Sequence, residues 1–214
     1  MKSEMISPLI KRSGKAAIAV LIGLAIAGCA PKEEVLGLHQ TGTMAFMLNC
    51  DQAASTYFEK AIKTNPEYGP SYIMLGDCYI REGKPEKAIK VIKKGLQYTS
   101  DEGHQRLAHR KLARAYHEIG QDEKALPHIM KYTRMSIMQD KFDETKKADT
   151  VNFIASLNIP EEQKVDLDPV IAACTAKRKK MLAEAEALNK QNRHQHSKES
   201  KDITGAVAGF LGLD

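Results

Sequence analysis

The side chains that could carry out chemistry in this sequence are four cysteines and seven histidines. His194 and His196 form an HxH pair in a polar tract, without the third ligand nearby that a metal site needs. His109 and His117 are eight residues apart, about two turns of a helix, so they are too far apart to chelate one ion together. The sequence contains no glycine-rich phosphate loop, no GxSxG and no HExxH. We therefore expect no enzyme activity, no metal and no cofactor.

One cysteine follows a segment with a recognisable role. Cys29 comes after an apolar run of twelve residues, Ala16 to Ala27, and the segment before that run, Met1 to Lys15, is basic. A helix needs about 20 apolar residues to cross a bilayer, so this run is short for a membrane span. A basic segment followed by a short apolar one is typical of a secretory signal peptide. An uncleaved signal anchor is the alternative.

The residues at the junction, Ile26, Ala27, Gly28 and Cys29, resemble the lipobox of bacterial lipoproteins. The resemblance implies that residues 1–28 are a signal peptide that is removed. It also implies a thioether-linked lipid on Cys29 and acylation of the new amino terminus. Two or more acyl chains, such as palmitate, anchor a protein stably, whereas one chain alone binds only marginally. Ala30 implies sorting to the periplasmic side of the outer membrane, and the inner membrane is the alternative.

The charge of the chain depends strongly on this leader. The full sequence has 32 basic and 27 acidic residues, and the leader contains four of the basic residues and one acidic residue. The remaining 186 of the 214 residues therefore carry 28 basic and 26 acidic side chains, a net charge of +2. So small an excess gives no argument for a nucleic-acid partner.

Three cysteines remain after Cys29 is assigned to lipid: Cys50, Cys78 and Cys174. None of them belongs to a CxxC or another metal-binding spacing. Two interpretations stay open. All three are small core residues, or Cys50 and Cys78 form a disulfide and one thiol stays free.

The middle of the chain repeats itself. Segments 72–96 and 109–133 align at a constant offset of 37 residues, and segment 38–66 aligns with 72–96 at an offset of 34. The first alignment pairs Leu75 with Leu112, Gly76 with Ala113, Tyr79 with Tyr116, Gly83 with Gly120, Ala88 with Ala125, and Ile92 with Ile129. The second pairs Gly42 with Gly76, Asn49 with Gly83, Ala54 with Ala88, and Phe58 with Ile92.

Each unit resembles the tetratricopeptide repeat, a helix–turn–helix of about 34 residues. The resemblance implies an all-α fold in which about three antiparallel helical hairpins form a short right-handed solenoid. In this interpretation the small residues at Gly76 and Ala88 let the two helices of a unit approach, and Gly83 and Gly120 supply the turns. An unrelated bundle of helical hairpins is the alternative.

The chain divides into five segments on this basis. They are a signal peptide (1–28), a lipid anchor and linker (29–37), a repeat array (38–138), a C-terminal helical cap (139–189) and a flexible polar tail with an apolar end (190–214). In the cap, Val151, Ile154 and Leu157 form one apolar stripe, and Asp168 and Pro169 mark the start of a second helix. We expect disorder in residues 190–202, which are almost entirely polar.

A tetratricopeptide array has a concave face made by the first helix of each unit, and the resemblance implies that ligands bind there. The alignment puts these residues on that face: Thr43, Phe46 and Met47; then Ile73, Asp77, Ile80 and Arg81; then Arg110, Arg114 and His117. This lining changes from apolar to basic along the array. It suits an extended or helical peptide with an apolar portion and an acidic end. The carboxylate clamp of the family is not matched residue for residue.

These observations predict a lipid-anchored adaptor that binds another envelope protein or peptide through its groove. Lipoproteins with such repeats resemble accessory factors of pilus and secretion machines, of outer-membrane assembly and of cell-wall synthesis. Pilus or secretion assembly is favoured by family association alone. The alternative is a periplasmic protein that binds a small molecule or metal, or a subunit of an envelope enzyme.

Overall fold

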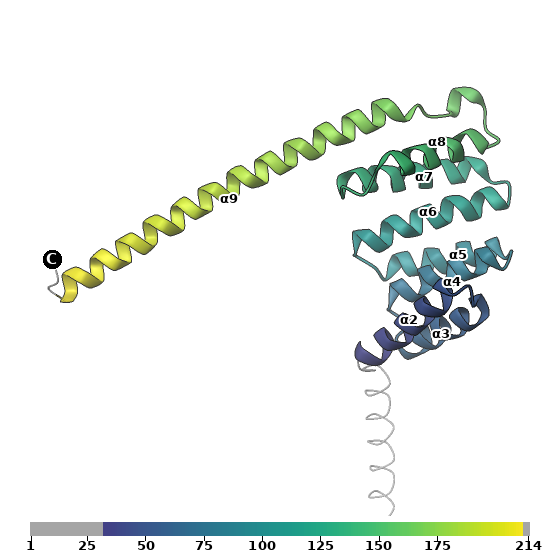
Figure 1. Ribbon diagram of the computed structural model, residues 1–214, viewed down its shortest axis with the longest axis horizontal. Helices are drawn as coiled ribbons and strands as arrows, with labels where there is room; N and C mark the ends of the chain where they lie inside the picture. Colours follow the sequence, from purple (N-terminus) through teal and green to yellow (C-terminus); the bar gives the residue numbers. More distant parts are fainter. Residues whose placement is uncertain (1–31, 212–214) are drawn as a thin grey trace, which may run out of the picture.

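The computed structural model describes residues 32–211, and within that range every regular element is a helix (Figure 1). The predicted all-α fold is confirmed for this part of the chain. The elements are α2 (Lys32–Met47), α3 (Asp51–Thr64), α4 (Gly69–Arg81), α5 (Pro85–Gln97), α6 (Glu102–Glu118), α7 (Asp122–Met138), α8 (Glu144–Ser156), η1 (Glu161–Gln163) and α9 (Leu167–Leu211).

The first six helices pack in three consecutive pairs, α2 with α3, α4 with α5 and α6 with α7. Short turns join the helices of each pair, so the two helices run antiparallel. The pairs then lie on one another, α3 against α4 and α5 against α6, and form the stack seen in Figure 1. We call α2 to α7 the stack.

A small residue in the first helix of a pair faces a large one in the second. A Cβ added to Gly76 would lie 2.2 Å from Ile92 Cγ1, and one added to Gly42 would lie 2.8 Å from Phe58 Cε1. Because contacts this short do not occur between real side chains, only glycine fits at these two positions. The expectation that Gly76 lets its helix approach the next one is confirmed, and Gly42 does the same in the first pair.

The turns inside the three pairs also repeat. Asn49, Gly83 and Gly120 have φ angles of 58°, +69° and +67°. This left-handed conformation suits glycine, and asparagine tolerates it better than most other residues do. The predicted turn roles of Gly83 and Gly120 are confirmed, and the sequence alignment had paired Asn49 with both.

The first helix begins earlier than the sequence indicated. Residues 29–37 were expected to be a linker, but α2 starts at Lys32 and Val35 is buried. Glu33 and Glu34 lie in the first turn, where negative charge is favoured by the helix dipole. The linker prediction is therefore wrong for residues 32–37, whereas Cys29 and the signal peptide lie outside the described residues.

The helices after the stack form a cap over its C-terminal end. Ile154 of α8 and Leu167 at the start of α9 pack with Ile129, Met130 and Tyr132 of α7. The predicted apolar stripe is partly wrong. Ile154 and Leu157 are buried, but Val151 is 44% exposed, because it lies about 100° around α8 from the buried Thr150.

The start of α9 also differs from the prediction by one to two residues. The helix begins at Leu167, and the backbone N–H of Asp168 donates to Asp166 Oδ1 at 3.0 Å. Asp166 therefore provides the capping oxygen that we expected from Asp168.

Helix α9 continues to Leu211, so the expectation of an unstructured polar tail from residue 190 is not met up to that point. Lys, Gln, Ala, Arg and Glu, which have good helix propensity, make up nine of the 22 residues from 190 to 211. Side chains from Met181 to His196 are exposed, and Figure 1 shows this part of α9 projecting away from the stack.

The three cysteines of the described chain are all free, Cys50 exposed, Cys78 buried and Cys174 half-buried. A Cys50–Cys78 disulfide is therefore absent, and the idea that all three are core residues is wrong for Cys50. Burial raises the pKa of the Cys78 thiol to about 11. Among residues 32–211 we find no helix that combines the length and apolar character needed to cross a membrane.

Candidate functional site

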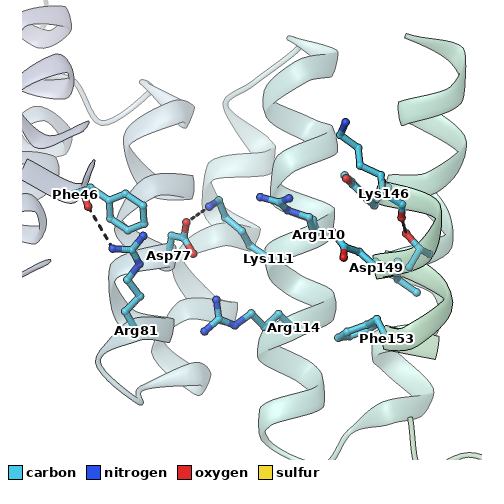
Figure 2. Close-up of a pocket in the computed structure, with 12 residues that line it drawn as sticks. Phe46, Asp77, Arg81, Arg110, Lys111, Arg114, Lys146, Asp149 and Phe153 are labelled. Carbon is cyan, nitrogen blue, oxygen red and sulfur yellow. Dashed lines mark hydrogen bonds and ion pairs between the residues drawn. The ribbon is translucent and has the colours of Figure 1, made fainter. Parts of the chain in front are cut away.

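A pocket of about 420 Å³ opens where the first helices of the three pairs meet the cap (Figure 2). Its lining comes from α2 (Phe46), α4 (Asp77, Arg81), α6 (Arg110, Lys111, Arg114), α7 (Ile129, Tyr132) and α8 (Lys146, Asp149, Thr150, Phe153). The first helices contribute because their outward faces share one side of the stack. Helix α8 closes the far wall.

Five of the predicted groove residues line this pocket: Phe46, Asp77, Arg81, Arg110 and Arg114. The structure therefore brings together residues from three repeats, although Phe46 and Arg114 are 68 positions apart in the sequence. Met47, which follows Phe46, is not part of the lining, and its side chain is 76% exposed.

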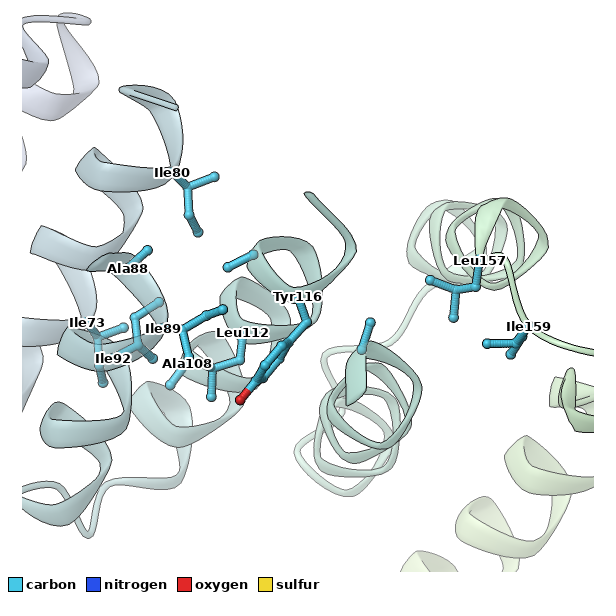
Figure 3. Packing of buried hydrophobic residues seen from close by; sticks show 12 residues of the cluster. Ile73, Ile80, Ala88, Ile89, Ile92, Ala108, Leu112, Tyr116, Leu157 and Ile159 are labelled. Atoms are coloured by element: carbon cyan, nitrogen blue, oxygen red, sulfur yellow. The ribbon is translucent and has the colours of Figure 1, made fainter. Parts of the chain in front are cut away.

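Two predicted groove residues lie in the interior instead. Ile73 and Ile80 are 1% and 3% exposed and belong to the core cluster around Ile92 and Leu112 (Figure 3). They point toward the second helix of their own pair and toward the next pair, so they cannot contact a ligand. The prediction is wrong for these two residues because the repeat alignment does not distinguish the side of a helix that packs in the core from the side that faces the groove.

His117 and Thr43 are also placed differently from the prediction. His117 Nδ1 lies 2.7 Å from Asp122 Oδ1, and the imidazole packs edge-on against Phe153. Asp122 in turn accepts a hydrogen bond from the backbone N–H of Asn158 at 2.6 Å. His117 therefore helps to join the stack to the cap, and Thr43 donates to the carbonyl of its own helix at His39.

Arg81 is held firmly at one end of the pocket. Its guanidinium lies 3.5 Å from the centroid of the Phe46 ring and donates to the Phe46 carbonyl at 3.3 Å. It also donates to Asn49 Oδ1 at 3.2 Å and to Asp51 Oδ1 at 3.1 Å. All three hydrogen bonds come from Nη1, and they tie α4 to the first pair.

Lys111 forms the floor of the pocket together with Asp77 (Figure 2). The Lys111 ammonium makes an ion pair with the Asp77 carboxylate, and both side chains are largely buried. Burial lowers the pKa of Lys111, and the nearby Asp77 charge opposes that effect. The two charges compensate each other, so this pair shapes the floor and adds no net charge to the pocket.

Arg110 and Arg114 provide the available positive charge. Arg114 Nε lies 2.9 Å from Glu118 Oε1, but this pair is exposed to solvent and therefore weak. The Arg110 guanidinium carbon lies 5.8 Å from the Tyr132 ring centroid. In the described part of the chain no carboxylate pairs with Arg110 within 4.0 Å. Arg110 is thus the lining cation best placed to receive an anion.

The sequence did not point to the walls that α7 and α8 supply. Tyr132 comes from α7, and Lys146, Asp149 and Phe153 reach the pocket only because the cap packs against the end of the stack. Counting all lining side chains, three arginines and two lysines stand against two aspartates, so the pocket carries an excess of positive charge. Within residues 32–211 no group of three His, Cys, Asp or Glu side chains is arranged to hold a metal ion.

A comparison with known protein families gives a match to part of the chain. Residues 50–114 are similar to a family described as regulator of microtubule dynamics protein 1-3. The matched segment comprises α3, α4, α5 and most of α6, which is less than a third of the 214 residues. It includes five lining residues: Asp77, Arg81, Arg110, Lys111 and Arg114. No curated protein matches the chain.

Proposed function

We propose that this protein is a membrane-anchored adaptor that binds an acidic segment of another protein in the pocket between α2, α4, α6 and α8. The observation that carries the proposal is the excess of positive charge on a concave surface that also has aromatic walls. Arginine beside aromatic rings is a combination that suits peptide carboxylates together with neighbouring apolar side chains.

The proposal includes a tetratricopeptide-type, right-handed solenoid as its scaffold. Two features support this finer assignment. Glycine faces a large side chain at equivalent positions of the first two pairs, and the turns of all three pairs share a left-handed residue. Such arrays use the surface of their first helices for binding, and the pocket lies on that surface.

The ligand that fits best has a carboxylate near an aromatic or aliphatic side chain. The carboxylate would be received by Arg110, with Arg114 at its side, because Arg81, Lys111 and Lys146 already have partners. The apolar neighbour would lie against Tyr132 and Phe153.

Location and cellular role are proposed from the sequence. The lipobox-like Ile26 to Cys29 supports lipid anchoring on the periplasmic side of the outer membrane, or of the inner membrane. An accessory role in pilus, secretion or outer-membrane assembly accords with this location. Replacing Cys29 with Ala should leave an uncut precursor or release the protein from the membrane fraction. Unchanged mass and unchanged fractionation would contradict the anchor.

Binding can be tested with fluorescent peptides of defined composition. One peptide carries aspartate or glutamate beside phenylalanine or leucine, and its partner has the acids replaced by amides. We expect the acidic peptide to bind and the amide peptide not to bind. An Arg110→Glu, Arg114→Glu variant should bind the acidic peptide at least about tenfold more weakly, since one charged hydrogen bond contributes roughly 1.5–3 kcal/mol. The matched control is Lys90→Glu, Arg134→Glu, which changes the net charge equally at exposed positions outside the pocket. Equal losses in both variants would contradict the assignment of the pocket.

The family similarity favours a second candidate, regulation of a cytoskeletal polymer. It rests on residues 50–114 only. Co-sedimentation of the purified chain with microtubules tests it, with the Arg110→Glu, Arg114→Glu variant beside the wild type. A small molecule or metal that co-purifies with the protein instead of a peptide would favour the alternative of a small-molecule-binding protein.

A further inference from the structure

The first helix of the stack has an exposed apolar face that the adaptor role does not use. Leu36, Met44, Met47 and Leu48 are 45%, 65%, 76% and 73% exposed. At 100° per residue, Leu36, Met44 and Met47 fall within about one quarter of the helix circumference. The exposed Gln40 lies between them, and Leu48 directly follows the last residue of α2. Val35 and Gly42, which are buried, lie on the opposite side, where α2 packs on the stack. We call the four residues the α2 face.

The position of the α2 face makes its composition unusual. Helix α2 belongs to the terminal pair, and it packs against α3 and α4 only from one side. Terminal units of repeat arrays ordinarily present a polar outer surface, because no further unit covers them. The far end of this stack is covered by α8 and α9, whereas the α2 end presents large apolar side chains.

The chain itself indicates what lies next to this face. Cys29, the residue proposed to carry lipid, precedes the start of α2 by three residues. Three residues span at most about 11 Å, so a lipid on Cys29 would hold the first turn of α2 at the membrane surface. The four apolar side chains extend over most of the length of a helix of 16 residues, about 24 Å. A helix that presents apolar residues along its length to the bilayer lies flat on it.

We propose that the α2 face docks onto the lipid bilayer and holds the stack in one orientation on the membrane. This inference rests on the anchor in the proposed function. From Glu33 to Met47 helix α2 contains no Lys or Arg, so the attraction is apolar and requires no anionic lipid. Phe46 lines the pocket, so docking through the α2 face leaves the pocket open to a partner.

The chain contains no Trp, so one introduced Trp reports on a single position. The full-length chain is produced in a lipidating bacterial host as two variants, Leu48→Trp on the α2 face and Leu188→Trp on the exposed part of α9. Both are reconstituted into phosphatidylcholine vesicles with and without brominated acyl chains. We expect a blue shift and quenching by bromine for Leu48→Trp only, unchanged by salt. Equal emission of the two variants in both vesicle types would overturn the proposal.

Charge substitutions distinguish docking of the α2 face on lipid from pairing of that face with a second copy of the chain. Adding Met44→Glu to Leu48→Trp should abolish the quenching. Adding Met181→Glu, at a methionine of α9 that is 50% exposed, should not. If the α2 face instead pairs with a second copy, Leu48→Trp will be blue-shifted without lipid and the protein will sediment as a dimer that Met44→Glu dissociates. That result overturns the proposal.

The mass of the purified protein shows whether Cys29 carries lipid. It therefore distinguishes an error in the proposed lipid anchor from an error in the proposed docking of the α2 face. An unmodified Cys29 would refute the lipid anchor, and vesicle flotation of the same unlipidated chain would then still test the face. Flotation that Met44→Glu removes and Met181→Glu leaves intact would support docking without the lipid. An unlipidated chain that does not float, or a lipidated chain whose Trp at position 48 is not quenched, contradicts it.

Discussion

The two ends of the stack differ in how their outer helices are covered. At the C-terminal end, α8 and the start of α9 cover the last pair, and Ile154, Leu157 and Leu167 are at most 4% exposed. At the N-terminal end nothing in the described chain covers α2, and Met44 and Met47 are 65% and 76% exposed. Within residues 32–211, only the C-terminal end is covered by other helices of the chain. The other end is available for an external surface.

The largest expected effect concerns the closed end. Leu157→Ala removes a side chain that is 2% exposed and packs with the core cluster of Leu112 and Ala125. Chemical denaturation should reveal a loss of about 3 kcal/mol in the free energy of unfolding. The matched control is Val151→Ala in α8, which is 44% exposed and should change stability by less than about 0.5 kcal/mol. Similar losses for both would mean that α8 packs through a different face.

Lowering the pH should reduce the free energy of unfolding at both ends, through the buried His109 in the last pair and the partly buried His39 in the first pair. In the last pair, His109 Nδ1 lies 2.8 Å from His128 Nδ1, and Tyr116 stacks on His128. Burial, followed by the charges of Lys131 and His128, lowers the pKa of His109 to about 4. Burial, with a smaller contribution from His104, lowers the pKa of His39 in the first pair to about 4.

A folded-state pKa below the unfolded value means that the unfolded chain binds protons first as the pH falls. Stability should therefore fall between about pH 6.5 and pH 4, by on the order of 2 kcal/mol for each histidine. His109→Gln should make the fall shallower in the last pair and His39→Gln in the first, as followed by hydrogen exchange of α6 and α2. A pH profile that neither substitution alters would contradict the role of the buried imidazoles.

The repeating part of the fold could be predicted from the sequence because local packing rules repeat with it. Gly76 opposite Ile92 and the turn at Gly83 each follow from a small residue at a fixed interval. The same regularity located Arg110 and Arg114 in the pocket. It failed for Ile73 and Ile80, since a repeat alignment gives the position along a helix more reliably than the direction of each side chain.

The non-repeating parts were harder to predict. Nothing in the sequence of α8 indicates that Lys146, Asp149 and Phe153 face α6, because this depends on how the cap docks against α7. The helix through residues 190–211 was missed for two reasons. The low apolar content of residues 190–202 was interpreted as disorder, and the glycines after residue 203 were expected to disfavour a helix.

Two glycines of α2 distinguish the side of this helix that packs on α3 from the side that is not covered. Gly42 faces Phe58, where an added Cβ would meet the buried ring at 2.8 Å, whereas an added Cβ at Gly37 has nothing within 4 Å. Gly42→Ala should destabilise the protein by about 1 kcal/mol or more through overpacking. Gly37→Ala should stabilise it by roughly 0.5–1 kcal/mol, because alanine is the better helix former. Thermal denaturation of the two variants checks the signs, and stabilisation by Gly42→Ala would mean that α2 does not pack on α3 as described.

The smallest expected change in stability concerns the α2 face itself. Met44→Ala removes a side chain that is 65% exposed, so in lipid-free solution the free energy of unfolding should change by less than about 0.5 kcal/mol. A loss as large as that of Leu157→Ala would mean that this end is covered in solution, by a second copy or by another part of the chain. Without such a loss, the open end differs from the closed end as described. Any effect of Met44→Ala that appears only when vesicles are added then measures the contact of the α2 face with lipid, independently of folding.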